Sequence, residues 1–220
     1  VVLSPHIQCG NPADAVSGFC HVFDEYGVRV TSCNDVTSGQ RVFLVPQNRL
    51  FMFAPHYVGH RVTLDHVRGA DGQPIVLETI SESPRVFHIH NFFSDAEATA
   101  LVDFALNEQN EEMKLKRSST GTQGYRVNPH RTSENAFDVG SPTSKALKAR
   151  GFELLGIRPY DETLADGIQV LRYNVSKAYI SHLDWIDPPA NSDHNWDSAG
   201  AGSNRYATIL LYLSDVEEGG

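Results

Sequence analysis

Three apolar runs near the carboxyl end constrain the fold of this chain most strongly. They cover Ile168–Val175, Ala178–Trp185 and Arg205–Leu213, and their spacing has the two-residue period of β-strands rather than a helical period. We therefore predict three buried or half-buried strands, the longest in the chain. The segment between the second and third strands, Ile186–Asn204, is rich in Pro, Gly, Asn and Ser. We interpret it as a long loop that could close over a bound molecule.

Two helices are predicted before these strands. Ser94 and Glu97 form a capping-box pattern after the strand-like run Arg85–His90, and the following apolar residues repeat at helical spacing. A second helix is expected to begin at Ser141-Pro142, because proline is favoured at the first helical position, and to end near Leu155. The apolar stripe of the first helix should lie against a sheet.

The first 80 residues are predicted to be a β-rich extension of small strands joined by turns. Short β-branched and aromatic runs occur at Val42–Val45, Leu50–Phe53 and Arg61–Leu64, separated by Pro, Gly and Asn. Three scattered histidines, His56, His60 and His66, are interpreted as surface or packed side chains rather than as metal ligands.

All three cysteines lie in this extension, at Cys9, Cys20 and Cys33. Their spacing matches no zinc signature. Two alternatives stay open: one disulfide with one free thiol, or three buried thiols in a reducing compartment.

The composition of the chain limits the classes of molecule that it is expected to bind. The chain has 220 residues, 40% of them hydrophobic and 20% charged, which is typical of a soluble globular protein, and its net charge is −9. An acidic protein repels phosphate backbones, so nucleic acid is not expected as a partner. The longest apolar run, Ala207–Leu213, is too short to span a membrane. The first residue is Val1, which leaves the compartment open, and the oligomeric state is not indicated by the sequence.

His182 and Asp184 are the strongest candidates for chemistry. Side chains two residues apart on a strand project from the same face, so this imidazole and this carboxylate can bind one metal ion together. Iron(II) enzymes that activate oxygen use two histidines and one carboxylate on one side of the ion. With 10 His and 27 acidic residues, however, about one such pair is expected by chance.

The sequence around this pair resembles the catalytic region of prolyl 4-hydroxylases. The order, the spacing and the closing acidic-Gly-Gly turn all agree with that family, and the resemblance extends over residues 84 to 220. The matching segments are Pro84–Phe87, Asn91–Ser94, Arg131–Ser133, Gln169–Tyr173, Tyr179–Asp184 and Arg205–Gly220.

The resemblance implies a mainly β fold with flanking helices, a double-stranded β-helix or jelly roll that is incomplete at its carboxyl end. Residues 81–220 would be the amino-terminal part of the dioxygenase domain, and residues 1–80 its extension. The implied reaction is peptidyl-proline 4-hydroxylation with Fe(II), 2-oxoglutarate and O₂, releasing succinate and CO₂, with ascorbate as a further cofactor. A proline-containing peptide or protein would be the substrate. The endoplasmic reticulum lumen or secretory pathway is the implied location, with a cytoplasmic or organellar one as the alternative.

Residue roles follow from the same resemblance. His182 and Asp184 match two iron ligands. The positions that match the 2-oxoglutarate pocket are Tyr173, Thr208 and Tyr212. The positions that match the substrate side are Tyr179, Arg205, Arg131 and Ser133. For any of these side chains, packing or surface exposure is the simpler alternative.

The sequence also departs from the family. Ser176-Lys177 replaces a usual Gly-Gln, and Ser181 replaces a frequent proline. The family's second histidine ligand and its 2-oxoglutarate lysine would fall beyond Gly220, so we expect the natural protein to be longer and these 220 residues alone to be inactive. Two other functions stay open: an inactive oxygenase-fold protein with a structural or scaffolding role, and, less favoured, a sugar-binding jelly roll.

Overall fold

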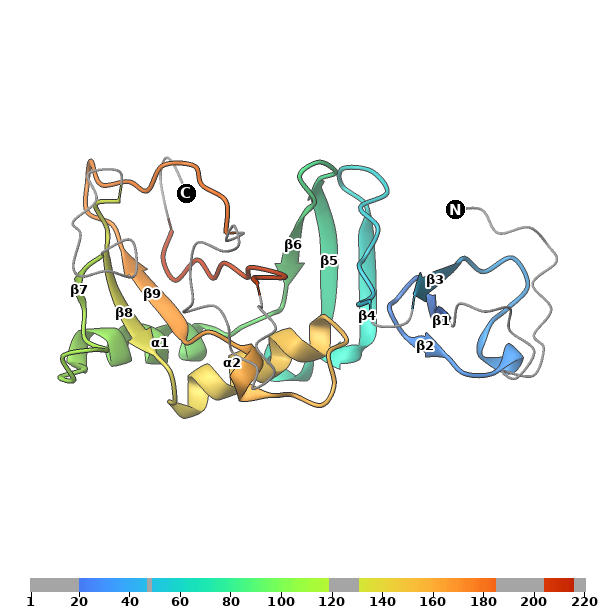
Figure 1. Ribbon diagram of the computed structural model, residues 1–220, viewed down its shortest axis with the longest axis horizontal. Helices are drawn as coiled ribbons and strands as arrows, with labels where there is room; N and C mark the ends of the chain where they lie inside the picture. The colour runs from blue at the N-terminus through green and yellow to red at the C-terminus, as the bar shows by residue number, and fades with distance from the viewer. Residues whose placement is uncertain (1–19, 47–48, 119–130, 185–203, 216–220) are drawn as a thin grey trace. The chain divides into compact units, whose positions relative to one another are not determined.

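The computed structural model describes residues 20–46, 49–118, 131–184 and 204–215 (Figure 1). Within these residues the chain is mainly β: its strands form three separate antiparallel sheets of three strands each, accompanied by two α-helices. The chain divides into two compact units, one from residues 1–94 and 146–165 and the other from residues 95–145 and 166–220. The predicted β-rich character is confirmed, and the jelly roll stays a prediction.

In the first unit, the first sheet has the strand order β2-β1-β3, with β1 at Cys20–Asp24, β2 at Arg29–Val30 and β3 at Val42–Pro46. A short 3-10 helix, η2 (Cys33–Asp35), follows β2 and is capped by Ser32. The predicted strand at 42–45 is thus confirmed.

The prediction of a strand at Leu50–Phe53 is wrong. Phe51 is only 7% exposed because its ring packs against Phe23, Phe43 and Phe53. Among the residues described, however, the segment pairs with no strand. An apolar run indicates burial, and here aromatic packing provides that burial without a strand ladder.

The cysteines fit the first of the two alternatives. Cys33 is disulfide-bonded, whereas Cys20 on β1 has a free and exposed thiol. Three unpaired thiols are therefore excluded. Cys9 lies outside the described residues.

The second sheet of this unit has the order β4-β5-β6, with β4 at Arg61–Arg68, β5 at Pro74–Ser81 and β6 at Val86–His90 (Figure 1). Its alternating residues give one apolar face, on which Leu64, Ile75 and Leu77 are buried, and one polar face. The predicted strands at 61–64 and 85–90 are confirmed. Residue 80 lies inside β5, and the division into domains at 80/81 stays a prediction.

A tight turn joins β4 to β5 through the short 3-10 helix η3 (Ala70–Gly72). The Ala70 amide donates a hydrogen bond to the Asn91 carbonyl, 2.9 Å away, just past the end of β6. A β-carbon at Gly69 would lie 1.8 Å from the same carbonyl oxygen. The turn and the end of β6 are therefore in direct backbone contact.

Helix α2 (Pro142–Leu154) begins one residue after Ser141, as predicted. Its start is fixed by Asp138, whose carboxylate accepts hydrogen bonds from the Ser141 amide and hydroxyl, while the Ser141 hydroxyl accepts one from the Ser144 amide. Further along, buried Lys148 forms an ion pair with Glu162 of the short 3-10 helix η4 (Glu162–Leu164).

The second unit contains the third sheet, ordered β7-β8-β9, with β7 at Lys116–Arg117, β8 at Glu134–Asp138 and β9 at Ile168–Arg172. Helix α1 (Asp95–Asn107) contacts β8 and β9, and its Leu101 and Ala105 are buried. This confirms the helix predicted after Ser94 and its position against a sheet. It also confirms the first of the three long strands, although β9 is shorter than predicted.

The other two long strands were predicted wrongly. Where the structure describes residues 178–184, they form only an isolated bridge between Tyr179 and Arg131, and residues 205–213 have no regular strand structure. Leu210 is 69% exposed. Alternating apolar residues favour an extended chain, but a strand also needs a hydrogen-bonded neighbour along its length, and within the described part of the chain these segments have none.

The segment predicted to close over a bound molecule, 186–204, lies outside the described residues except for its last, Asn204. Among the helices that the structure describes, none is long and apolar enough to cross a bilayer.

Candidate functional site

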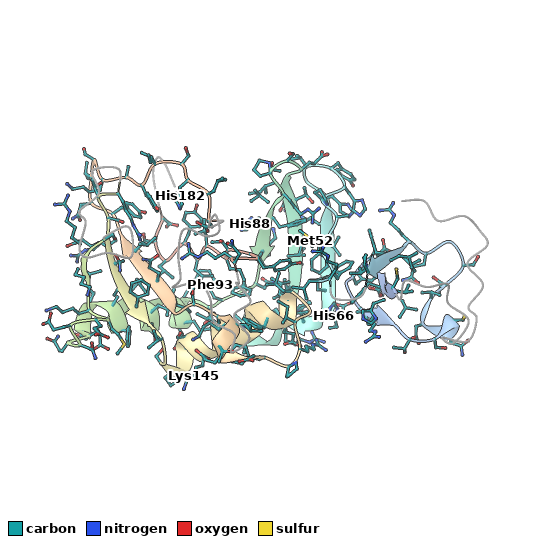
Figure 2. All side chains as sticks on the ribbon, in the orientation of Figure 1. Met52, His66, His88, Phe93, Lys145 and His182 are labelled. Carbon is teal, nitrogen blue, oxygen red and sulfur yellow. The ribbon has the colours of Figure 1, made fainter. Side chains whose placement is uncertain are left out.

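The predicted pair of metal ligands lies close together in the second unit, and Figure 2 labels one of the two, His182. Nε2 of His182 is 3.2 Å from Oδ1 of Asp184. On the other side of the ring, Nδ1 is 2.9 Å from the Ile180 carbonyl oxygen, which can only accept a hydrogen bond. Nδ1 therefore carries a proton, and Nε2 is the atom available to a metal ion.

The carboxylate of Asp184 is oriented by a second side chain. The Thr208 hydroxyl donates a hydrogen bond of 2.5 Å to Oδ2, so Oδ1 is the oxygen that faces His182. Nη1 of Arg205 is 4.0 Å from Oδ1, while its Nε is 3.4 Å from Asp166. Each ligand atom thus has a hydrogen bond on the opposite side of its own group, which fixes its direction.

Tyr179 and Arg131 form one side of this site. The Tyr179 ring stacks on the His182 imidazole, with ring centroids 3.8 Å apart and planes 19° apart. The Arg131 guanidinium carbon lies 4.9 Å from the centre of the Tyr179 ring. The two segments are also joined through the backbone, because Arg131 and Tyr179 form the isolated β-bridge and the Thr132 amide donates to the Ala178 carbonyl. This wall holds the imidazole plane of His182 in place.

The remaining predicted residues have other surroundings. Ser133 is fully buried, and its hydroxyl is 3.0 Å from that of Ser118. Tyr173 and Tyr212 are 44% and 59% exposed. The structure therefore brings together six of the predicted residues: His182, Asp184, Thr208, Arg205, Tyr179 and Arg131.

Two protein ligands are one fewer than the iron(II) triad requires. Within the residues described, three potential ligand side chains lie close enough to share one ion at a different place, in the first unit: Glu78 of β5 with His88 and His90 of β6. Sequence reasoning missed this group. The signal was present in His88-x-His90, which has the same two-residue spacing as His182-x-Asp184 and lies on a predicted strand.

No family model and no solved structure matches the chain. Curated relatives do match it. The probable prolyl 4-hydroxylase 3 of Arabidopsis thaliana is 30% identical over 143 residues, which is 65% of this chain and 46% of that protein. Prolyl 4-hydroxylase 5 of the same plant is 30% identical over 66% of this chain and 46% of its own length. The human prolyl 4-hydroxylase subunit alpha-3 is 32% identical over 67% of this chain and 26% of its own length.

The matched part of the chain therefore has the sequence of a prolyl hydroxylase-like dioxygenase, an oxidoreductase. These relatives are prolyl 4-hydroxylases of plants and animals, which confirms the resemblance that the sequence around His182 and Asp184 predicted. It spans about half the length of the plant relatives and about a quarter of the animal subunit.

Proposed function

We propose that the protein hydroxylates proline residues of a peptide or protein at carbon four, with Fe(II), 2-oxoglutarate and O₂, and releases succinate and CO₂. The observation that carries this proposal is the arrangement of His182 and Asp184 in a prolyl 4-hydroxylase sequence. Nε2 and Oδ1 are 3.2 Å apart, and two ligand atoms bound to one ion at about 2.1 Å lie roughly 3.0–3.4 Å apart. The donor set also fits iron(II), because an imidazole and a carboxylate are two members of its triad.

The iron and 2-oxoglutarate would supply the oxidising chemistry, and the protein would supply position. His182 and Asp184 would hold the ion, each kept in one orientation by the Ile180 carbonyl and the Thr208 hydroxyl. The Thr208 hydroxyl already donates its one proton to Asp184, so in this arrangement it acts as a positioning residue. Contacts to 2-oxoglutarate are proposed for Tyr173, Tyr212 and Thr208; the two tyrosines are exposed, and Thr208 would make its contact through the methyl group while its hydroxyl holds Asp184.

On the substrate side, we assign the peptide to the wall beside His182. Tyr179 presents an aromatic ring on which a proline ring can pack, and Arg131 and Arg205 offer donors to peptide carbonyls. Ser133 is proposed to contribute through the position of its loop, because its own side chain is buried. Such contacts would hold the proline carbon close to the metal.

The same family relationship supports three further proposals. Residues 81–220 would belong to a double-stranded β-helix domain preceded by an extension of residues 1–80. The location would be the secretory pathway, a proposal supported by the disulfide at Cys33, since disulfides persist in oxidising compartments. Ascorbate would be a further cofactor.

A protein without turnover is the second candidate function, as a structural or scaffolding relative. Such a protein could bind iron through the same His182–Asp184 pair but would form no hydroxyproline. The two functions therefore differ in whether hydroxyproline is formed, and a measurement of iron binding alone does not distinguish them.

The deciding experiment measures iron binding and hydroxyproline formation together. We expect the full-length natural protein to bind Fe(II) under anaerobic conditions and to form hydroxyproline in a proline-rich peptide with stoichiometric succinate, measured by mass spectrometry. In a His88→Ala background, which removes one of the three potential ligands in the first unit, Asp184→Ala should abolish both signals, whereas Asp166→Asn, which changes only a partner of Arg205, should keep the iron. Iron retained by Asp184→Ala would overturn the assignment. Iron binding without hydroxyproline in the unaltered protein would favour the scaffolding role.

A further inference from the structure

We propose that Glu78, His88 and His90 form a second metal site, which binds a divalent transition metal of the Zn²⁺ class. This site does not rest on the proposed hydroxylation, because it shares no residue with the His182–Asp184 pair. Its ligands come from two neighbouring strands of the β4-β5-β6 sheet, and Figure 2 shows His88 on this sheet.

The register of the sheet places these side chains on one face. Glu78 of β5 lies directly opposite Arg61 of β4 on one side and opposite His88 of β6 on the other. His90 is two residues further along β6, so it projects from the same face as His88. The opposite face carries buried Ile75 and Leu77, which hold the two strands in register. The group is therefore set by the sheet itself and not by a loop.

The distances are close to those of a bound site. The potential ligand atoms of the three residues all lie within 4.8 Å of one another, and the two imidazole centroids are 4.1 Å apart. Ligand atoms around a tetrahedral Zn²⁺ are separated by about 3.4 Å, given metal–ligand distances of about 2.1 Å. His90 and Glu78 are already in contact, with Nε2 2.8 Å from Oε2. Only a modest inward rotation of the side chains is needed, and His88 is exposed.

The carboxylate of Glu78 keeps one oxygen for the ion. Both hydrogen bonds from Arg61, at 3.0 and 2.8 Å, and the contact to His90 involve Oε2. Arg61 can therefore keep its bond to Oε2 while Oε1 binds the metal.

Two imidazoles and one carboxylate are the ligand set of several zinc sites that keep one position open for water. A hydrogen-bonded His90–Glu78 pair needs only one histidine, and the second imidazole at His88, directly opposite the carboxylate, has no role in such a pair. A shared ion gives all three side chains a partner. It would also join β5 to β6 across their polar face.

The test uses Co²⁺, which replaces Zn²⁺ and has visible absorption, on the full chain carrying His182→Ala and Asp184→Ala so that the proposed iron pair cannot bind. We expect one Co²⁺ per chain by equilibrium dialysis, with an absorption spectrum of nitrogen and oxygen ligands. Adding His88→Ala, or separately Glu78→Gln, should raise the Co²⁺ dissociation constant about tenfold or more. Even residues that only hydrogen-bond to a metal ligand contribute that much to metal affinity.

His66→Ala serves as the matched control, because His66 is a histidine of β4 in the same sheet that is not one of the three potential ligands, and it should leave Co²⁺ binding unchanged. His88→Ala removes only an exposed side chain, so it remains informative if Glu78→Gln does not fold; circular dichroism checks the fold of each variant. The proposal is overturned if no Co²⁺ binds, or if folded His88→Ala binds it as tightly as its parent.

Discussion

The Thr208 hydroxyl donates a hydrogen bond of 2.5 Å to Oδ2 of Asp184, across 24 residues of sequence. This contact joins two segments that were each predicted as a strand but that form no strand ladder in the described structure. A side-chain bond, rather than a backbone one, therefore sets the direction of the Asp184 carboxylate.

The first prediction follows from this bond. Thr208→Val keeps the size of the side chain but removes its donor, so we expect the Fe(II) dissociation constant to rise by about 10–100-fold. Thr208→Ser restores the hydroxyl and should restore most of the affinity. Anaerobic equilibrium dialysis measures both. Unchanged affinity in Thr208→Val would show that the hydroxyl does not orient the ligand.

A second prediction concerns the ring that stacks on His182. Tyr179→Phe keeps the stack, whereas Tyr179→Ala removes it and frees the imidazole to rotate. We expect iron binding to persist in the phenylalanine variant and to weaken severalfold in the alanine variant. If Tyr179 also contacts the substrate, peptide KM should rise in the alanine variant beyond what the loss of iron explains. Equal iron affinity in both variants would contradict the positioning role.

Asp138 offers a test of stability away from either metal site. Its carboxylate is fully buried and accepts hydrogen bonds from Ser141 at the start of α2. Asp138→Ala should lower the free energy of unfolding by about 1–3 kcal/mol, because two donors lose their partner. Urea unfolding measures the change. Glu112→Ala, at an exposed position, is the control and should stay within about 0.5 kcal/mol of the parent.

A further prediction is that His66 contributes to the change in folding stability with pH. Desolvation, together with the nearby charge of Arg158, lowers the pKa of His66 below its ordinary value of 6.5. The unfolded chain therefore binds more protons than the folded one just below pH 6.5, so stability should fall as the pH drops from 6.5 toward the folded-state pKa.

The check is to compare urea midpoints at neutral and mildly acidic pH. His66→Asn should reduce the loss of stability on acidification, whereas Thr63→Ala, which changes a residue of the same surface pocket without removing a titratable group, should not. An identical pH dependence in His66→Asn and the parent would show that this histidine does not contribute.

Sequence patterns correctly predicted the elements that short-range interactions determine. The capping signals at Ser94 and Ser141 led to α1 and α2, and the alternation after Ile168 led to β9. The proximity of His182 and Asp184 needed only an extended backbone, so it holds although the predicted strand does not form. Their roles, with those of the other site residues, remain predictions.

What failed depended on contacts between distant segments. Whether Arg205–Leu213 forms a strand depends on its neighbours, which its own sequence does not specify. The group of Glu78, His88 and His90 depends on the register of β5 against β6. His88-x-His90 was visible in the sequence, but the strand position of Glu78 opposite His88 was not.

Gly69 has a consequence for the range of sequences that this fold tolerates. Its backbone angle of φ −83° suits any residue, so the requirement for glycine comes from space alone: a β-carbon would meet the Asn91 carbonyl oxygen at 1.8 Å. In saturation mutagenesis, position 69 should accept only glycine, while exposed Arg68 beside it accepts most residues. Missense variants at this one position would therefore lower the amount of folded protein, although every candidate metal ligand is unchanged.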